Sequence, residues 1–117
     1  MRSDVPYLEH IADSISAIES YVAGGRDMFM KERLVQDAVI RNFEIIGEAA
    51  RQLSSAVRDR PGLVWSKIIA FRNRLIHGYR SVDLLLVWDV VVNDLPPLKT
   101  EVARLLNELS GPGEASE

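Results

Sequence analysis

Apolar residues recur at the helical period from the start of the chain. Between about Asp4 and Val22 they stand alternately three and four positions apart, the spacing that lines one face of an α-helix. The series is Leu8, Ile11, Ile15, Ile18 and Val22. It predicts a first helix packed by one face against a core, which Gly24-Gly25 then ends.

Two segments in the middle of the chain show the same period. Residues 28–53 and 64–77 each carry an apolar stripe with charged residues opposite, which indicates two amphipathic helices. We expect Gly78 to follow the second of these as its C-terminal left-handed residue. Between them lies a polar stretch, 54–62, whose Arg60-Pro61-Gly62 is typical of a turn.

Residues 84–92 are so rich in leucine and valine that a buried strand fits their local pattern almost as well as a helix. Ser81 and Asp83 supply helix start signals. No second strand candidate exists, and an isolated strand would leave backbone groups unsatisfied, so we predict a helix. Pro96-Pro97 then kinks or restarts it. The last helical piece carries Leu98, Val102, Leu105 and Leu109.

The helix predicted over 28–53 has more apolar surface than one bundle core requires. Ile40, Phe43, Gly47 and Ala50 widen its apolar arc. Because a large apolar face is not normally left in water, we interpret this arc as a second buried face and as a candidate dimer surface.

Length and composition describe a single domain. The 117 residues suffice for one core, so we expect one domain over 1–110 and a flexible polar tail over 111–117. The lack of cysteine excludes disulfides and thiolate chemistry. No apolar run approaches the roughly twenty residues of a membrane span, and no signal peptide is recognised at the N-terminus, which predicts a cytoplasmic protein. The net charge of -3 argues against broad coating of nucleic acid but permits a local basic patch.

An arginine and a histidine stand out in the segment 64–77. Helical phase places Arg72 within the apolar stripe, which is a costly position for a guanidinium. A lone arginine there would be interpreted as paired with a carboxylate or as reaching out to the surface. His77 follows five positions later, about 140° round an ideal helix. A shared site therefore requires a helix that ends there or a second subunit.

Four neighbours complete this cluster. Asn73 lies four positions before His77, so its amide can fix the tautomer of the imidazole. Tyr79 adds a hydroxyl, and Arg74 and Arg80 flank the group. Such a density of cationic and protic side chains suits a phosphodiester, and we expect Arg74 and Arg80 to bind its phosphate.

The run Arg72-Asn73-Arg74-Leu75-Ile76-His77-Gly78-Tyr79 resembles the R-x-x-x-x-H-x-Y motif of HepT-like toxins in the HEPN superfamily. All three defining positions match. Residues 38–50 and 87–96 also resemble the second and fourth helices of that family, so the resemblance covers nearly the whole chain.

The resemblance implies an all-α, HEPN-type antiparallel bundle of four to five helices that dimerises, with two motifs bordering one cleft. It implies the toxin of a type VII toxin-antitoxin system, an endoribonuclease that needs neither metal nor other cofactor. Arg72 and His77 would be catalytic, and Asn73 and Tyr79 would assist. The implied partner is an MntA-like nucleotidyltransferase antitoxin, which silences the toxin by adenylylating Tyr79.

Other interpretations stay open. The bundle could be a non-catalytic docking subunit for a nucleotidyltransferase, or a module that grips ATP, although the chain has no glycine-rich phosphate loop. His10 stands three positions from Asp13, as metal ligands can, but two such residues on an exposed face are more often solvated, and we assign no metal. Asn42 either borders the cleft or bonds a buried backbone group.

Overall fold

The structure is a computed structural model that describes residues 2–60, 64–78 and 82–109. In these ranges the chain forms seven α-helices, one short 3-10 turn and no strand. The long helices are α1 (Val5–Tyr21), α3 (Arg33–Arg51), α5 (Val64–His77), α6 (Leu84–Asn93) and α7 (Leu95–Leu109), and the short ones are α2 (Arg26–Lys31) and α4 (Ser55–Arg58). The predicted all-α bundle is confirmed, including the helix rather than a strand over 84–92.

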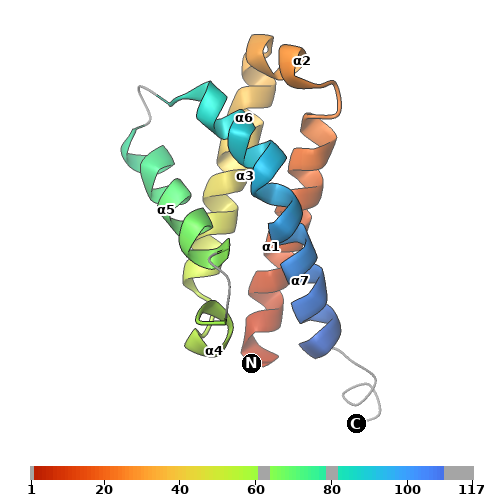
Figure 1. Ribbon diagram of the computed structural model, residues 1–117, viewed down its shortest axis with the longest axis vertical. Coiled ribbons are helices and arrows are strands. Elements are labelled where there is room, and N and C mark those ends of the chain that lie inside the picture. The colour runs from red at the N-terminus through yellow and green to blue at the C-terminus, as the bar shows by residue number, and fades with distance from the viewer. Residues whose placement is uncertain (1, 61–63, 79–81, 110–117) are drawn as a thin grey trace.

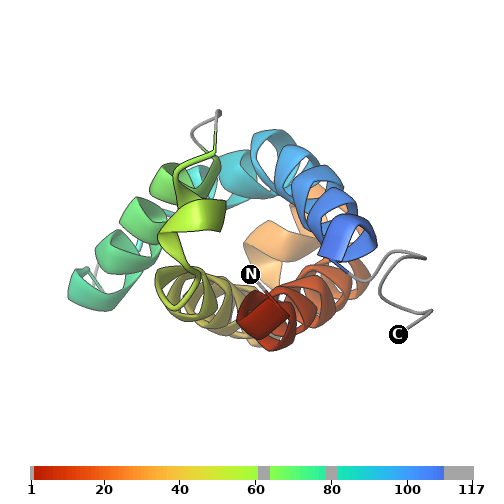
Figure 2. The same ribbon diagram turned by 90° about the horizontal axis from the view of Figure 1, so that it is seen from below.

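The long helices lie side by side around one core. α3 contacts α1 on one side and α5 on the other, while α7 packs beside α1 (Figure 1). Seen along the bundle, α5, α3, α1 and the α6–α7 pair surround a common centre (Figure 2). The largest side chains enclosed there are Trp65, Phe29 and Phe43.

The wide apolar arc of α3 is buried inside the chain itself. Phe43 and Ala50 are completely enclosed, and Gly47 is buried as well. The ring of Phe43 meets the ring of Phe71 from α5 edge to face, with 5.1 Å between the centroids. Phe43, Gly47 and Ala50 are therefore buried within the chain rather than available as a dimer surface, whereas Ile40 is half-buried, and dimerisation stays a prediction.

The helix predicted over 28–53 is broken in two at Glu32. That residue has extended backbone angles, φ -101° and ψ 102°, and separates α2 from α3. The turn allows Phe29 to enter the core and to pack on Trp88, with ring centroids 5.4 Å apart. The amide of Gln36 donates to the carbonyl of Phe29 at 2.9 Å, so a side chain satisfies a carbonyl near the break.

The start of α6 and the junction with α7 follow the predicted signals. The carboxylate of Asp83 accepts hydrogen bonds from the backbone N–H groups of Leu85 and Leu86 at 3.0 and 3.3 Å, which is an N-terminal cap. A break at Asp94 separates the two helices. Pro96 and Pro97 then fall in the first turn of α7, where a missing N–H costs little, so the prolines accompany a restart.

Of the glycines in the described ranges, Gly25 alone has a positive φ, at 95°, and it stands where α1 was expected to end. Gly78 does not adopt the predicted left-handed conformation. Its N–H donates to the carbonyl of Arg74 at 2.9 Å, which continues the helical hydrogen-bonding pattern for one more residue. The prediction for Gly78 was therefore wrong.

The predicted turn at 60–62 and the tail over 111–117 fall largely or wholly outside the described residues.

A buried carboxylate ties the N-terminal turn to the end of α3. Asp4 is only 2% exposed, and it accepts hydrogen bonds from the N–H and the hydroxyl of Ser54, both at 2.7 Å. These bonds compensate the carboxylate for its lost hydration.

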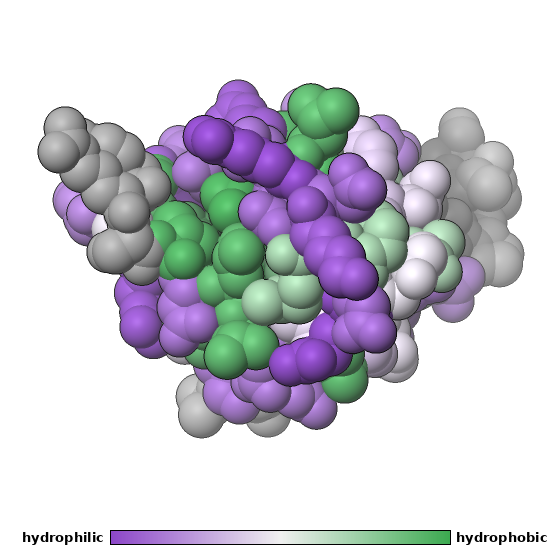
Figure 3. Space-filling view, turned by 90° about the horizontal axis from the view of Figure 1, so that it is seen from above, coloured by the Kyte–Doolittle hydropathy of each residue, from purple (hydrophilic) through white to green (hydrophobic). Residues whose placement is uncertain are grey.

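The upper end of the molecule has a hydrophobic area of surface next to a hydrophilic one. Hydrophobic residues gather on the side where α6 begins, beside a band of hydrophilic residues (Figure 3). Large exposed apolar side chains include Leu34 at the start of α3 and Leu85 and Val92 on α6. None of the described helices is both long enough and apolar enough to cross a membrane.

Candidate active site

Arg72 lies on α5 where that helix comes closest to α3. A Cβ built on Gly47 would stand 2.1 Å from the Cβ of Arg72, so only a glycine allows this approach. The arginine side chain is 19% exposed. Its aliphatic stem is therefore packed between helices, as helical phase predicted.

The guanidinium of Arg72 is held by two polar neighbours. It forms an ion pair with Glu48 of α3, with 2.8 Å between Nη2 and Oε2. Its Nη1 donates to Oδ1 of Asn73 at 3.1 Å. The Nε atom is buried and meets no acceptor among the described residues. Arg72 thus has the carboxylate partner that a structural arginine would have, but that partner is itself 49% exposed.

His77 is the last residue of α5, and its side chain is exposed. It borders a hollow of about 320 Å³ together with Arg74, Gly78 and Asp83. Arg72 borders a different hollow, of about 420 Å³, on the outer face of α3. Within one chain the two residues therefore face separate hollows, as their angular separation predicts.

The structure describes only some of the other residues of the predicted cluster. Asn73 bonds to Arg72, and the structure contains no hydrogen bond between Asn73 and His77. Arg74 is exposed and shares the hollow of His77. Tyr79 and Arg80 lie outside the described residues.

Two of the remaining sequence interpretations concern His10 and Asn42. The amide of Asn42 donates to the carbonyl of Ala38 at 2.9 Å, which is the backbone bond that was one of its two interpretations. His10 borders the same hollow as Arg72. In the ranges that the structure describes, no three histidine or acidic side chains come together as metal ligands, and metal independence stays a prediction.

Gly47 and Glu48 are the residues that sequence reasoning missed. Glu48 is one of the charged residues opposite the apolar stripe of its helix, and it is exposed. Its pairing with Arg72 depends on which helix packs against α3, and no spacing in the sequence reveals that. The signal that was present is the Gly47-Glu48 pair, in which a small residue is followed directly by a charged one.

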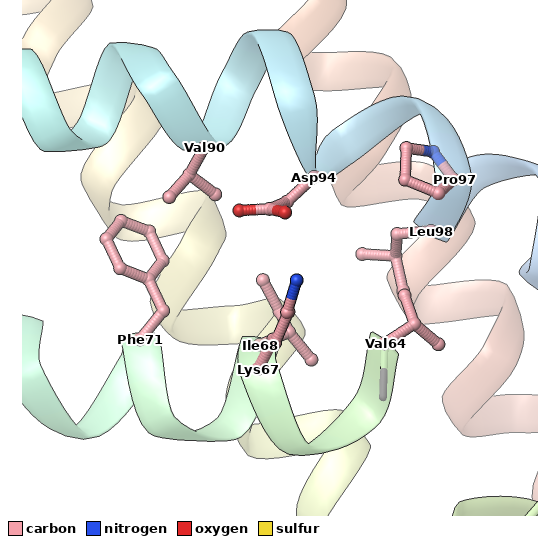
Figure 4. A pocket seen from close by; sticks show the side chains of 8 residues that line it. All are labelled: Val64, Lys67, Ile68, Phe71, Val90, Asp94, Pro97 and Leu98. Atoms are coloured by element: carbon pink, nitrogen blue, oxygen red, sulfur yellow. The ribbon is translucent and has the colours of Figure 1, made fainter. Parts of the chain in front are cut away.

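A third hollow, a cavity of about 270 Å³, lies between α5 and the α6–α7 junction. Its walls are mostly apolar, and Lys67 and Asp94 point into it from opposite sides (Figure 4). It contains neither Arg72 nor His77 and is separate from the candidate site.

A family model described as "Ribonuclease HepT-like" matches residues 11–105. The chain therefore belongs to the ribonuclease HepT-like family, which agrees with the resemblance of its motif. The match includes the all-helical core together with Arg72 and His77.

Several curated proteins are similar along most of this chain. "Probable ribonuclease HepT" of Thermococcus cleftensis is 37% identical over 89% of this chain and 96% of its own length. "Putative RNase TTE0752" of Caldanaerobacter subterraneus is 32% identical over 92% of this chain and 98% of its own.

A longer relative is "Gamma-glutamylcyclotransferase and putative RNase MJ0434" of Methanocaldococcus jannaschii, 43% identical over 93% of this chain. The match spans half of that relative's length. No solved structure matches this chain.

Proposed function

We propose that this protein is the toxin of a type VII toxin-antitoxin system and acts as a metal-independent endoribonuclease. The observation that carries the proposal is the intact pattern Arg72, His77 and Tyr79 in a member of the ribonuclease HepT-like family. Two relatives bear the names "Probable ribonuclease HepT" and "Putative RNase TTE0752", which supports the same activity. The exposed His77 at the end of α5 is accessible to a substrate.

The proposed reaction is an internal transesterification of RNA. His77 accepts the proton of a ribose 2'-hydroxyl, whose oxygen attacks the adjacent phosphorus. Arg72 stabilises the negative charge of the phosphorane. The bond from phosphorus to the 5'-oxygen then breaks, and that oxygen receives the proton that His77 took up. The products are a 2',3'-cyclic phosphate and a 5'-hydroxyl.

The proposed active form is a homodimer. Because Arg72 and His77 border different hollows of one chain, a site that uses both is completed by Arg72 of one protomer and His77 of its partner. In a twofold dimer such an arrangement occurs twice.

The first experiment is a cleavage assay with labelled RNA in the presence of a chelator. We expect wild type to cut and both Arg72→Ala and His77→Ala to be inactive. The matched control is Arg104→Ala, which removes an arginine paired with a glutamate on α7 and should cut like wild type. Failure of unmodified, dimeric wild type to cut any of several RNA classes would contradict the ribonuclease proposal.

A mixing experiment tests the shared site. Two inactive variants, Arg72→Ala and His77→Ala, are unfolded together and refolded so that protomers exchange. If each site draws on both protomers, every heterodimer has one intact site, and roughly a quarter of the wild-type activity returns. If each site lies within one protomer, the mixture stays inactive.

The proposed regulation is adenylylation of Tyr79 by an MntA-like nucleotidyltransferase. An added phosphate near Arg72 and His77 would compete with RNA for the same cations. Incubation with the nucleotidyltransferase and ATP should add AMP to wild type and to Tyr21→Phe, which removes an exposed tyrosine of α1. Tyr79→Phe should stay unmodified, and a mass increase in that variant would contradict Tyr79 as the acceptor.

One observation favours the alternative, a docking subunit for a nucleotidyltransferase without activity of its own. Arg72 already has a carboxylate partner, at 2.8 Å. In that case Arg72→Ala lowers stability, while neither it nor His77→Ala changes any effect of the protein on RNA or on growth.

A further inference from the structure

The hollow beside Arg72 crosses the outer face of α3 between α1 and α5, with a volume of about 420 Å³. Three helices contribute ionisable side chains to it. These are His10 from α1, Arg41, Glu44, Glu48 and Arg51 from α3, and Arg72 from α5. Three arginines against two glutamates give it a positive balance, although the whole chain has a net charge of -3.

The arginines of this hollow are paired only with exposed or partly exposed carboxylates. Arg41 lies 3.5 Å from Glu44, and Arg51 lies 3.2 Å from Glu48. The side chains of Arg51 and Glu48 are 47% and 49% exposed. Exposed ion pairs contribute little to stability, so another anion can replace these carboxylates at small cost.

Glu48 occupies a position that suits a phosphate oxygen. Its Oε2 atom lies 3.2 Å from Nη1 of Arg51 and 2.8 Å from Nη2 of Arg72. A single anionic oxygen is thus shared by two guanidiniums from different helices. Guanidinium groups bind phosphate oxygens with the same donor geometry that they offer to carboxylates.

The arginines are spread along the helix rather than gathered at one point. Arg41 and Arg51 are ten residues apart, which is about 15 Å along α3. That span exceeds one phosphate group and fits a chain of phosphates in single-stranded nucleic acid.

We propose that this hollow binds the sugar-phosphate backbone of the RNA substrate, with a phosphate oxygen replacing the Glu48 carboxylate between Arg51 and Arg72. The inference rests on the proposed function, because Arg72 is the catalytic arginine there. It assigns Arg41 and Arg51 to substrate binding and makes Glu48 an internal competitor of RNA.

The test measures binding of a short 2'-O-methyl RNA, which lacks the attacking hydroxyl, by fluorescence anisotropy at several salt concentrations. Arg51→Gln should weaken binding roughly three- to tenfold and lower the slope of log affinity against log salt by about one. The matched control is Arg104→Gln, whose arginine pairs with a glutamate three positions away, as Arg51 does, but on α7. It should leave both quantities unchanged.

A second variant separates competition from a structural role. Glu48→Gln should strengthen binding several-fold, since it removes the competing charge, while Glu48→Asp should stay close to wild type. If Glu48 only positioned Arg72, Glu48→Gln would weaken binding instead. Thermal unfolding of each variant verifies that the fold is retained.

The inference is overturned if wild type does not bind, or if Arg51→Gln binds like Arg104→Gln. It is also overturned if AMP displaces the oligonucleotide far better than inorganic phosphate does, since that would indicate a mononucleotide pocket. Binding that depends on Arg51 in a protein that cuts no RNA would contradict the ribonuclease proposal alone. Cleavage by a protein whose binding ignores Arg51 would contradict this inference alone.

Discussion

The two sides of α5 are packed in contrasting ways. Towards α3 the helices approach so closely that Gly47 has no room for a methyl group, and Phe71 meets Phe43 edge to face. Towards α6 and α7 a cavity of about 270 Å³ remains, into which Lys67 and Asp94 point (Figure 4). The same helix is therefore fixed on one side and loosely covered on the other.

This difference indicates which contact positions the candidate site. Arg72 belongs to the closely packed side, where its stem rests on Gly47 and its guanidinium reaches Glu48. The cavity on the loosely covered side contains neither Arg72 nor His77, although His77 borders a separate hollow between α5 and α6. Substitutions on the α3 side should therefore cost more, in stability and in activity, than comparable ones on the α6–α7 side.

The largest expected effect on stability comes from truncating a large side chain in the closely packed contact between α3 and α5. Phe43→Ala should lower the free energy of unfolding by about 3–5 kcal/mol, because the ring is fully enclosed. On the other side Val90→Ala removes a smaller group that already borders a cavity, and we expect about 1–2 kcal/mol. Urea unfolding measures both, and equal losses would contradict the comparison.

Filling the closely packed side should also be costly. Gly47→Ala places a methyl group against Arg72, so we expect a loss of about 1–3 kcal/mol together with reduced cleavage of RNA. Its control is Gly24→Ala, whose new methyl group would meet only the flexible side chain of Met28. Val90→Ile, which grows into the cavity, should be tolerated. A Gly47→Ala variant as stable and active as Gly24→Ala would show that α5 can move away from α3 without loss of stability or of cleavage.

A smaller effect concerns pH, because an ion pair between Arg60, after α4, and Glu108 of α7 titrates. Arg60, after α4, donates to Glu108 of α7 at 2.6 and 3.1 Å, and this hydrogen bond lowers the pKa of Glu108 below its ordinary value. A lowered pKa stabilises the fold above the pKa of the unfolded chain, and the contribution disappears as pH falls through the folded value.

The melting temperatures of wild type and Glu108→Gln should therefore differ most near neutral pH and converge as the pH falls through the lowered pKa of Glu108. The apolar contacts between α3 and α5 predict no such convergence for Phe43→Leu. A difference between wild type and Glu108→Gln that persists in acid would contradict the role of the charge.

The smallest effect is expected at Lys67. Its side chain is exposed and points into an open cavity, so Lys67→Met should change the free energy of unfolding by no more than about 0.5 kcal/mol. RNA cleavage should remain as in wild type. A marked loss of activity would show that the cavity between α5 and α7 takes part in function.

Much of the fold follows from the sequence, because one helical period runs through it. The bounds of α1 and α5 were predicted within about a residue or two, a margin at which helix ends are always uncertain. The break at Glu32 was not predicted, since no glycine or proline marks it. It depends on the packing of Phe29 against Trp88, a contact between residues far apart in the chain.

The candidate site was predictable only for residues within one helix. Helical phase gave the half-buried position of Arg72 and its angular separation from His77. The second buried face of α3 was also recognised, but its partner was taken to be another chain, because the apolar pattern of a helix does not say what covers it. For the same reason the ion pair between Arg72 and Glu48 could not be predicted.

The interruption between α2 and α3 has a mechanical consequence. A break in a helix commonly serves as a joint about which its two halves swing. Here the Gln36 side chain bonds across the interruption, and Phe29 is anchored in the core. The two halves are thus locked at a fixed angle, and the interruption stiffens this end of the bundle.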